Sequence, residues 1–291
     1  MINILISVDS NYLDKARTML FSMRRHTAED ISVYMLNHSL SENEIQQFAA
    51  YLKEKCRMQL HTVDTKRTAL DNFPLMDGNI AIETYYRILA QFLLPDSLER
   101  VLWLDADIVV LNDISAFYHQ AFDGAKYVVC PDSKCDSYWV RDCKEKLQLP
   151  AEHVYFNSGV MLMNLDALRQ GCCMEDLLRQ CELIKDRLTY HDQDILNYIY
   201  RDQVKYADWK KYNYQCILLS RVPAEDEPDI VILHYTGPDK PWNYWQIKNK
   251  SKYYWKVRYE QGDKWPAIKA YLKKIWEMTV LYVRELKDIL P

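Results

Sequence analysis

The chain has 291 residues and a mass of 34.7 kDa, enough for one large domain or two small ones. With 49% hydrophobic and 27% charged residues it can bury a sizeable core, so the composition excludes a disordered or fibrous protein. The formal net charge of −4 gives no reason to expect a nucleic-acid binder. The six glycines have the wrong spacing for a Rossmann fingerprint, a Walker A loop or a kinase glycine-rich loop. Any phosphate must therefore be held by a metal ion, side chains or helix ends.

The N-terminus and the cysteines bear on where the protein works. Residues 1–8 lack the basic region and the cleavage site of a signal peptide, and they are typical of a first strand. No uninterrupted apolar run reaches the roughly 18 residues that a membrane span needs. The eight cysteines contain no CxxC motif and match neither a zinc module nor a disulfide framework. These features predict a cytoplasmic protein with reduced thiols.

The first 130 residues alternate short apolar runs with stretches of helical periodicity. This pattern predicts an α/β fold with a mainly parallel sheet covered by helices on both faces. Ser41 and Glu44 form a capping-box signature at the start of one helix. A further helix is expected at 82–94, with Tyr85 and Ile88 on its apolar face. The other predicted elements are strands at 2–8, 31–36, 58–63 and 101–104, and helices at 11–25 and 41–55.

The sharpest feature is VLWLDADIVV, a buried strand followed by Asp105 and Asp107. In open α/β sheets ligands bind beyond the carboxyl ends of strands, which is where these acids fall. Two carboxylates there can hold a divalent ion that neutralises a diphosphate, as in nucleotide-sugar glycosyltransferases. A polar strand end with an aspartate turn is the structural alternative. The pattern also fits DxD phosphatases of the haloacid-dehalogenase type, although these carry the motif on their first strand.

A second predicted strand, at 229–234, also ends in functional residue types. His234 can ligate a metal ion, Gly237 lets a loop pass close to a ligand, and Lys240 is a point charge suited to a phosphate. Taken alone, a histidine at a strand end is more often structural. The close spacing of the three residues favours a binding loop.

Two further segments have both a functional and a structural interpretation. In HDQD, Asp192 opens a predicted helix and is either a site residue or a helix cap. Arg87 belongs to a polar stripe with Thr84 and Gln91, and it is either a site residue or half of an i,i+4 ion pair with Glu83.

Five segments occur in order along the chain: FPL…TYYR, LDAD, YFNSGV, HDQD and HYTGPDKPW. In this order and at roughly these intervals they resemble family-8 glycosyltransferases, above all the bacterial lipopolysaccharide α-galactosyl- and α-glucosyltransferases. The likeness covers about residues 2–245. It implies a GT-A fold, in which one nucleotide-diphospho-sugar domain has a Rossmann-like mixed central sheet with helices on both faces. It also implies a UDP-hexose donor, a saccharide acceptor and Mn²⁺ or Mg²⁺.

The resemblance assigns roles to individual residues. It implies that Asp105, Asp107 and His234 ligate the metal ion, and that Asp192 and Gln193 act at the transferred sugar. Because Gln193 is a poor nucleophile, retention by front-face displacement is favoured over a covalent intermediate. The implied donor-binding residues are Val8, Asp9, Asn11, Tyr12, Arg87, Asp105, Ala106, Asn157, Ser158, Asp192, Gln193, His234, Gly237 and Lys240. A phosphatase and a non-catalytic nucleotide-sugar-binding protein are the alternatives.

The composition changes near the C-terminus. Residues 241–291 hold 11 lysines and arginines against 5 acids, and 11 of the 37 aromatic residues. We therefore expect a catalytic domain at 1–245 and a helical extension at 246–291. Basic and aromatic side chains together predict peripheral attachment to the inner face of an anionic membrane. Packing on the core or an oligomer contact is the alternative, and the oligomeric state is left open.

Overall fold

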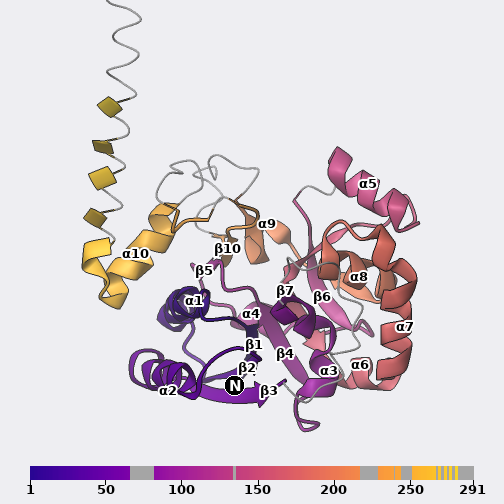
Figure 1. Cartoon of the computed structure of the whole chain (residues 1–291), viewed down its shortest axis with the longest axis horizontal. Coiled ribbons are helices and arrows are strands. Elements are labelled where there is room, and N and C mark those ends of the chain that lie inside the picture. The colour runs from indigo at the N-terminus through magenta and orange to yellow at the C-terminus, as the bar shows by residue number, and fades with distance from the viewer. Residues whose placement is uncertain are drawn as a thin grey trace, which may run out of the picture.

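The structure is a computed structural model of the chain (Figure 1). It describes residues 1–65, 82–133, 136–216, 229–238, 240–243 and 251–266, and the pairs 268–269, 272–273, 275–276 and 279–280. The predicted domain boundary after residue 245 lies outside these described residues.

A mixed seven-stranded sheet forms the centre of the molecule, in the order β3-β2-β1-β4-β7-β6-β8. Strand β7 runs antiparallel to both of its neighbours, and the other pairs are parallel. A smaller sheet has the order β5-β10-β9. The strands are β1 (Ile2–Ser7), β2 (Ile31–Asn37), β3 (Gln59–Asp64), β4 (Arg100–Leu104), β5 (Ile108–Val110), β6 (Tyr127–Pro131), β7 (Phe156–Asn164), β8 (Val204–Tyr206), β9 (Tyr214–Gln215) and β10 (Ile232–His234).

Helices cover both faces of the large sheet, which confirms the predicted fold class. In Figure 1, α1 and α2 lie on one side and α3, α6, α7 and α8 on the other. The predicted capping box of Ser41 and Glu44 is present at the start of α2. The α-helices are α1 (Leu13–His26), α2 (Glu42–Tyr51), α3 (Ala90–Leu93), α4 (Ser115–Tyr118), α5 (Tyr138–Lys146), α6 (Leu165–Gly171), α7 (Met174–Ile184), α8 (His191–Ile199), α9 (Trp209–Tyr212) and α10 (Ser251–Gln261). A π-helical turn, η1 (Leu52–Cys56), and two 3₁₀ helices, η3 (Ile82–Ile88) and η4 (Lys185–Arg187), complete them.

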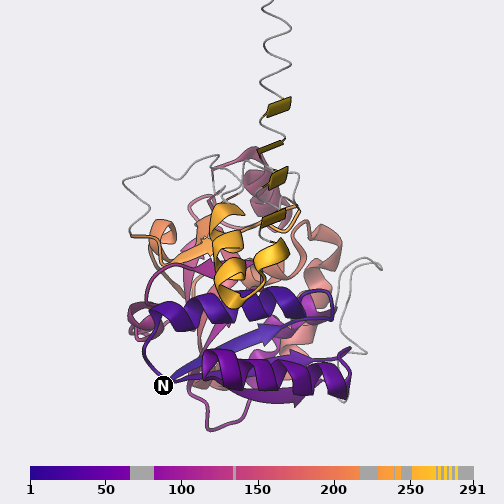
Figure 2. The same ribbon diagram turned by 90° about the vertical axis from the view of Figure 1, so that its left-hand side faces the viewer.

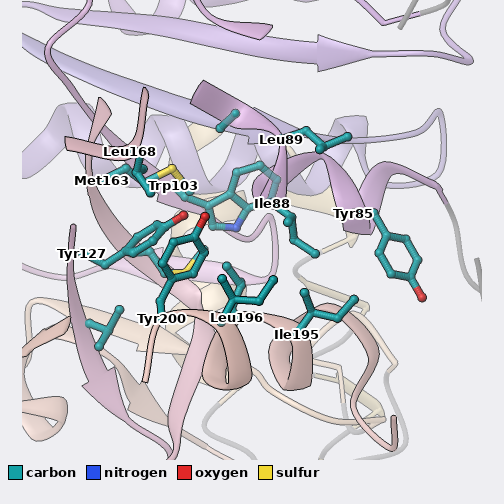
Figure 3. Close-up of a cluster of buried hydrophobic side chains, with 14 of the residues drawn as sticks. Tyr85, Ile88, Leu89, Trp103, Tyr127, Met163, Leu168, Ile195, Leu196 and Tyr200 are labelled. Carbon is teal, nitrogen blue, oxygen red and sulfur yellow. The ribbon is translucent and has the colours of Figure 1, made fainter. Parts of the chain in front are cut away.

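The core has two layers because successive side chains of a strand point to opposite faces of the sheet. Along β4, Val101 and Trp103 enter the layer under α3 and α6 to α8, whereas Leu102 and Leu104 enter the layer under α1 and α2. Figure 3 shows Trp103 in the first of these layers, between side chains of η3 and of α8. The indole of Trp103 is 1% exposed, so the strand that leads to Asp105 is firmly anchored.

The prediction of one continuous helix at 82–94 is wrong in the type of helix. The segment is a 3₁₀ helix, η3, up to Ile88 and a short α-helix, α3, from Ala90. In a 3₁₀ helix residues three apart lie on one line, so Tyr85 and Ile88 both reach the core. The apolar face is thus as predicted, but the tighter winding sets the direction of Arg87. The strand predicted at 229–234 is also shorter than expected, since β10 begins at Ile232.

Helix α10 packs on α1, on the left of the molecule in Figure 1 and facing the viewer in Figure 2. Arg258 donates to the Asp14 carboxylate at 2.5 Å, and the Gln261 amide donates to the Tyr51 hydroxyl at 2.6 Å. The part of the predicted extension at 251–261 is therefore held against the body. Among the described residues, no helix has both the length and the apolar composition to cross a membrane. The seven described cysteines are all free thiols, as expected.

Candidate active site

Polar side chains from distant parts of the chain gather around one cavity of about 360 Å³. The cavity lies beyond the carboxyl end of β4, where the antiparallel β7 begins and the short β10 ends. An open α/β sheet places its ligands at this edge. The lining residues are Arg87, Asp105, Asp107, Asp132, Val140, Asn157, Ser158, Tyr190, His191, Asp192, Gln193, Gln215, His234, Thr236, Gly237 and Lys240.

Asp105, Asp107 and His234 meet at one side of the cavity, with one ligand atom of each within 4.8 Å of the others. Nε2 of His234 lies 3.1 Å from Oδ1 of Asp107 and 3.8 Å from Oδ2 of Asp105. Oδ1 of Asp107 is buried and accepts no hydrogen bond, which is costly unless a cation binds it. Two carboxylates and an imidazole suit a divalent metal ion. The three residues therefore fit the ion that the sequence predicts.

The neighbours of Asp105 hold its carboxylate in one orientation. The Trp103 indole nitrogen donates to Oδ1 at 3.0 Å, and the Arg87 guanidinium pairs with the same oxygen at 3.1 Å. The second oxygen, Oδ2, is left on the side of His234. A side chain held in this way needs little reordering to bind a cation, because its rotamer is already fixed.

Lys240 and Asp107, which both line the cavity, form a partly buried ion pair. The Lys240 ammonium group donates to Oδ2 of Asp107 and to the backbone oxygen of Tyr235, the latter at 2.8 Å. Burial raises the pKa of Asp107, but the charge of the neighbouring Lys240 opposes this effect, and the pKa lies below its usual value. Asp107 is thus ionised at neutral pH and available as a ligand.

Arg87 joins the Asp105 side of the cavity to Asp192. Its Nε lies 3.1 Å from Oδ2 of Asp192, and its NH1 group donates to the Ser158 backbone oxygen at 2.8 Å. Arg87 therefore spans the cavity instead of making only the i,i+4 pair that local spacing allows. Burial raises the pKa of Asp192 to about 6, although the charge of Arg87 opposes the rise. Asp192 does not cap α8, because Asp194 accepts the backbone N–H groups of Thr189 and Tyr190 instead.

Gln193 faces the same cavity from the first turn of α8. Its Oε1 accepts from Asn157 Nδ2 at 3.0 Å and from the Ser158 backbone N–H at 3.1 Å. Its Nε2 lies 3.5 Å from a carboxylate oxygen of Asp132. The carbonyl end of this amide is therefore occupied by the protein, and its NH₂ end is turned toward the cavity.

The remaining predicted donor residues do not line the cavity. Val8 is buried in the core, and Ala106 stands between the two acids. Asp9 accepts the Tyr12 backbone N–H at 2.9 Å and the Asn11 amide at 3.1 Å, which orders the loop after β1. The exposed Tyr12 ring packs edge-on against Trp242, with the ring centres 5.8 Å apart. The predicted role of this loop remains a prediction.

Sequence reasoning missed several lining residues, among them Asp132, Gln215 and His191. Asp132 directly follows the apolar strand β6, so the pattern that marked Asp105 could have identified it. Gln215 is 1% exposed and lies in a two-residue strand that no sequence pattern indicates. His191 has a φ of 50°, a backbone conformation rare outside glycine and asparagine.

Comparison with known proteins agrees with this geometry. The model of the family named glycosyl transferase family 8 matches residues 3–246. The lipopolysaccharide 1,2-glucosyltransferase of Escherichia coli strain K12 is 27% identical over 271 residues, covering 87% of this chain and 76% of that protein. The lipopolysaccharide 1,3-galactosyltransferase of Salmonella typhimurium is 25% identical over 261 residues, with the same coverage.

A solved structure shares the fold. The galactosyltransferase LgtC, in complex with donor and acceptor sugar analogues, superimposes with a TM-score of 0.76 at 23% identity, covering 90% of this chain and 96% of that chain. This likeness shows that the architecture is that of a GT-A glycosyltransferase. The family match spans most of the chain and includes every residue of the cavity. The chain is therefore a member of glycosyltransferase family 8, a sugar transferase that resembles the bacterial lipopolysaccharide glycosyltransferases.

Proposed function

We propose that the protein transfers galactose or glucose from a UDP-sugar to a saccharide acceptor of a cell-surface glycan, forming an α-linkage with retention. The observation that carries the proposal is the cluster of Asp105, Asp107 and His234, which shares one cavity with the buried Arg87 and the half-buried Lys240. A metal-binding group beside Lys240 and Arg87 suits a sugar diphosphate, whose negative charge must be neutralised at departure. The names of the relatives in Escherichia coli and Salmonella typhimurium support the substrate class.

The residues of the cavity have different roles in the release of the nucleoside diphosphate. A divalent ion, when bound by Asp105, Asp107 and His234, supplies positive charge to the diphosphate; Mn²⁺ or Mg²⁺ suits this ligand set. Lys240 supplies a further charge for the leaving oxygen. Arg87 and Asp192 are ordered by their mutual ion pair and by Ser158, so they can hold sugar hydroxyls in a fixed position.

The contacts of Gln193 and Asp192 favour front-face displacement. A covalent intermediate requires a free nucleophilic oxygen below the sugar, as in retaining glycosidases. Oε1 of Gln193 accepts two N–H groups, and Oδ2 of Asp192 contacts both Arg87 and Ser158. In front-face displacement the bond between the anomeric carbon and the β-phosphate oxygen breaks as the acceptor oxygen bonds on the same face. The acceptor proton passes to the departing phosphate oxygen.

A donor screen tests the proposal. Release of UDP is measured with UDP-glucose, UDP-galactose and their N-acetyl derivatives, with and without EDTA. We expect turnover with one of the first two donors and its loss in EDTA. Binding of UDP without transfer to any acceptor would instead indicate a nucleotide-sugar-binding protein. Hydrolysis of a phosphomonoester without any UDP-sugar would indicate a phosphatase.

The raised pKa of Asp192 predicts a pH dependence. The ionised carboxylate pairs with Arg87, and it takes up a proton as the pH falls through about 6. We therefore expect kcat to decline about tenfold for each pH unit below this value, since only the ionised fraction keeps the pair. The measurement is kcat between pH 4.5 and 8 at saturating metal and donor. Asp192→Asn is the control, because its residual rate lacks this titration; a decline of the same size in Asp192→Asn would assign the dependence to another group.

We further propose that the segment after α10 attaches the enzyme peripherally to the inner face of the cell membrane. The described residues between 264 and 280 are helical, and their large apolar side chains are exposed. Each of these side chains lies three or four positions from another of the set, so they share one helix face, flanked by lysines, which suits an anionic interface. They are Trp265, Ile268, Leu272, Ile275 and Trp276.

Vesicle sedimentation tests the attachment. We expect the full chain to pellet with vesicles that contain anionic lipid, and Trp265→Ser combined with Trp276→Ser to lower the bound fraction several-fold. Trp139→Ser is the matched control, since Trp139 is 61% exposed on α5, away from this segment. Unchanged binding of the double variant would refute the anchor and leave the helix face for an oligomer contact.

A further inference from the structure

A chain of buried amide side chains joins His234 to Gln193. Nδ1 of His234 lies 2.9 Å from Oδ1 of Asn213, and Nδ2 of Asn213 lies 2.9 Å from Oδ1 of Asn157. Nδ2 of Asn157 then donates to Oε1 of Gln193 at 3.0 Å. Asn213 is fully buried, at the C-terminal end of α9 and directly before β9. In the pairing of β9 with β10, His234 lies opposite Gln215, so Asn213, two residues earlier on the same side of the strand, lies within reach of the His234 ring.

Two backbone N–H groups fix the direction of every hydrogen bond in this chain. The Gly159 N–H donates to Oδ1 of Asn157 at 3.0 Å, so this atom is an acceptor. Asn213 must therefore present its NH₂ group to Asn157 and its oxygen to His234. The Ser158 N–H likewise donates to Gln193, which confirms that the Gln193 oxygen points inward. The amide orientations thus follow from the backbone.

The direction of these hydrogen bonds has a consequence at each end of the amide chain, His234 and Gln193. Since Oδ1 of Asn213 only accepts, Nδ1 of His234 must carry a proton, which leaves Nε2, the nitrogen that faces Asp105 and Asp107, as the one that can bind a metal ion. At the other end, the Gln193 NH₂ group is turned toward the cavity. Such outer partners of a metal-binding histidine typically contribute 10- to 100-fold to metal affinity or activity.

We infer that Asn213 is a positioning residue for both halves of the site. It selects the metal-binding tautomer of His234, and through Asn157 it orients Gln193. The inference rests on the proposed function, because it assumes a metal ion at Asp105, Asp107 and His234. It extends that function to a residue that itself lies outside the cavity lining.

The unmodified protein provides the first test. Long-range ¹H–¹⁵N NMR spectra of the metal-free protein distinguish the two histidine tautomers by the shifts of their ring nitrogens. We expect Nδ1 of His234 to carry a proton. An unprotonated Nδ1 would overturn the inference without any substitution, and so without any question of misfolding.

Substitution of Asn213 provides the second test. Mn²⁺ binding is measured by electron paramagnetic resonance, and we expect Asn213→Ala to weaken it about 10- to 100-fold. Asn37→Ala is the matched control: Asn37 is also buried, and its Oδ1 accepts the Leu40 backbone N–H at 2.9 Å, outside this chain of amides. We expect Asn37→Ala to keep the Mn²⁺ affinity of the parent protein. Equal affinity of Asn213→Ala and the parent would refute the positioning of His234.

Asn213→Asp separates the effect of Asn213 on His234 from its effect on Gln193. The aspartate still accepts the proton of His234 Nδ1 but cannot donate to Asn157. We expect Mn²⁺ binding at least as tight as in the parent, and a kcat about tenfold lower at saturating Mn²⁺ and donor. An unchanged kcat would refute the coupling to Gln193. If the parent protein binds no Mn²⁺ or transfers no sugar, the proposed function fails instead, and the His234 tautomer still reports on Asn213 independently.

Discussion

Asp105→Asn is expected to lower turnover about a thousandfold, since a metal ion supplies several kcal/mol to the departing charge and each 1.36 kcal/mol is tenfold in rate. Asp105→Asn changes only the oxygen that would bind the metal ion. The asparagine oxygen can keep the contacts that Oδ1 now makes with Trp103 and Arg87. Only the oxygen on the side of His234 is replaced, by an NH₂ group that repels a cation. The measurements are UDP release and Mn²⁺ binding.

The control for this variant is a fold measurement and a distant aspartate. In the absence of metal ions, the melting temperature of Asp105→Asn should stay close to that of the parent protein, because the contacts of Oδ1 are retained. Asp96→Asn changes a fully exposed carboxylate and should leave turnover unchanged. Normal turnover of Asp105→Asn would show that the assignment of the metal site is wrong.

Gly159→Ala is expected to abolish metal binding and to lower turnover at least a hundredfold, because the added methyl group occupies the space between two ligands. A Cβ built at Gly159 collides with the His234 ring and lies 2.8 Å from Oδ2 of Asp105. Both neighbours are held, His234 by its strand β10 and Asp105 by Trp103 and Arg87, so neither can move away cheaply. Isothermal titration with Mn²⁺ and the rate of UDP release measure the loss.

Gly171→Ala is the matched control. A Cβ at Gly171 meets only the far end of the Lys126 side chain, which can swing aside. We expect this variant to bind Mn²⁺ and to turn over as the parent does. If Gly159→Ala keeps its metal affinity, the ligands are more mobile than their contacts indicate, and the site does not require glycine here.

The sequence predicts those site residues whose position follows from the strands. Asp105 and Asp107 follow an apolar strand, and His234 ends another, so the rule for strand ends marks each of them as a candidate. Only the family resemblance groups the three as one metal site. Arg87 could be identified only through the resemblance. Its direction depends on the 3₁₀ winding of η3, which local helical periodicity does not distinguish from an α-helix.

Residues that act by positioning other side chains leave little signal in the amino-acid sequence. Asn213 looks like an ordinary asparagine at a helix end, and its importance comes from a register between two strands of two and three residues. Asp192 resembles a helix cap in sequence, yet α8 has no side-chain cap, and Asp192 lines the cavity while Asp194 binds the backbone N–H groups just before the helix. Such roles are set by tertiary packing, which local spacing does not contain.

The three ligand residues belong to two different sheets. Asp105 follows β4 of the large sheet, whereas Asp107 and His234 flank the pairing of β5 and β10 in the small one. An ion held by all three is therefore a cross-link between the sheets. By mass action a ligand at 100 times its dissociation constant stabilises the folded state by about 2.7 kcal/mol. A metal ion bound at this site would therefore also stabilise the folded protein. We expect the enzyme to resist heat and proteolysis longer when the metal ion is available.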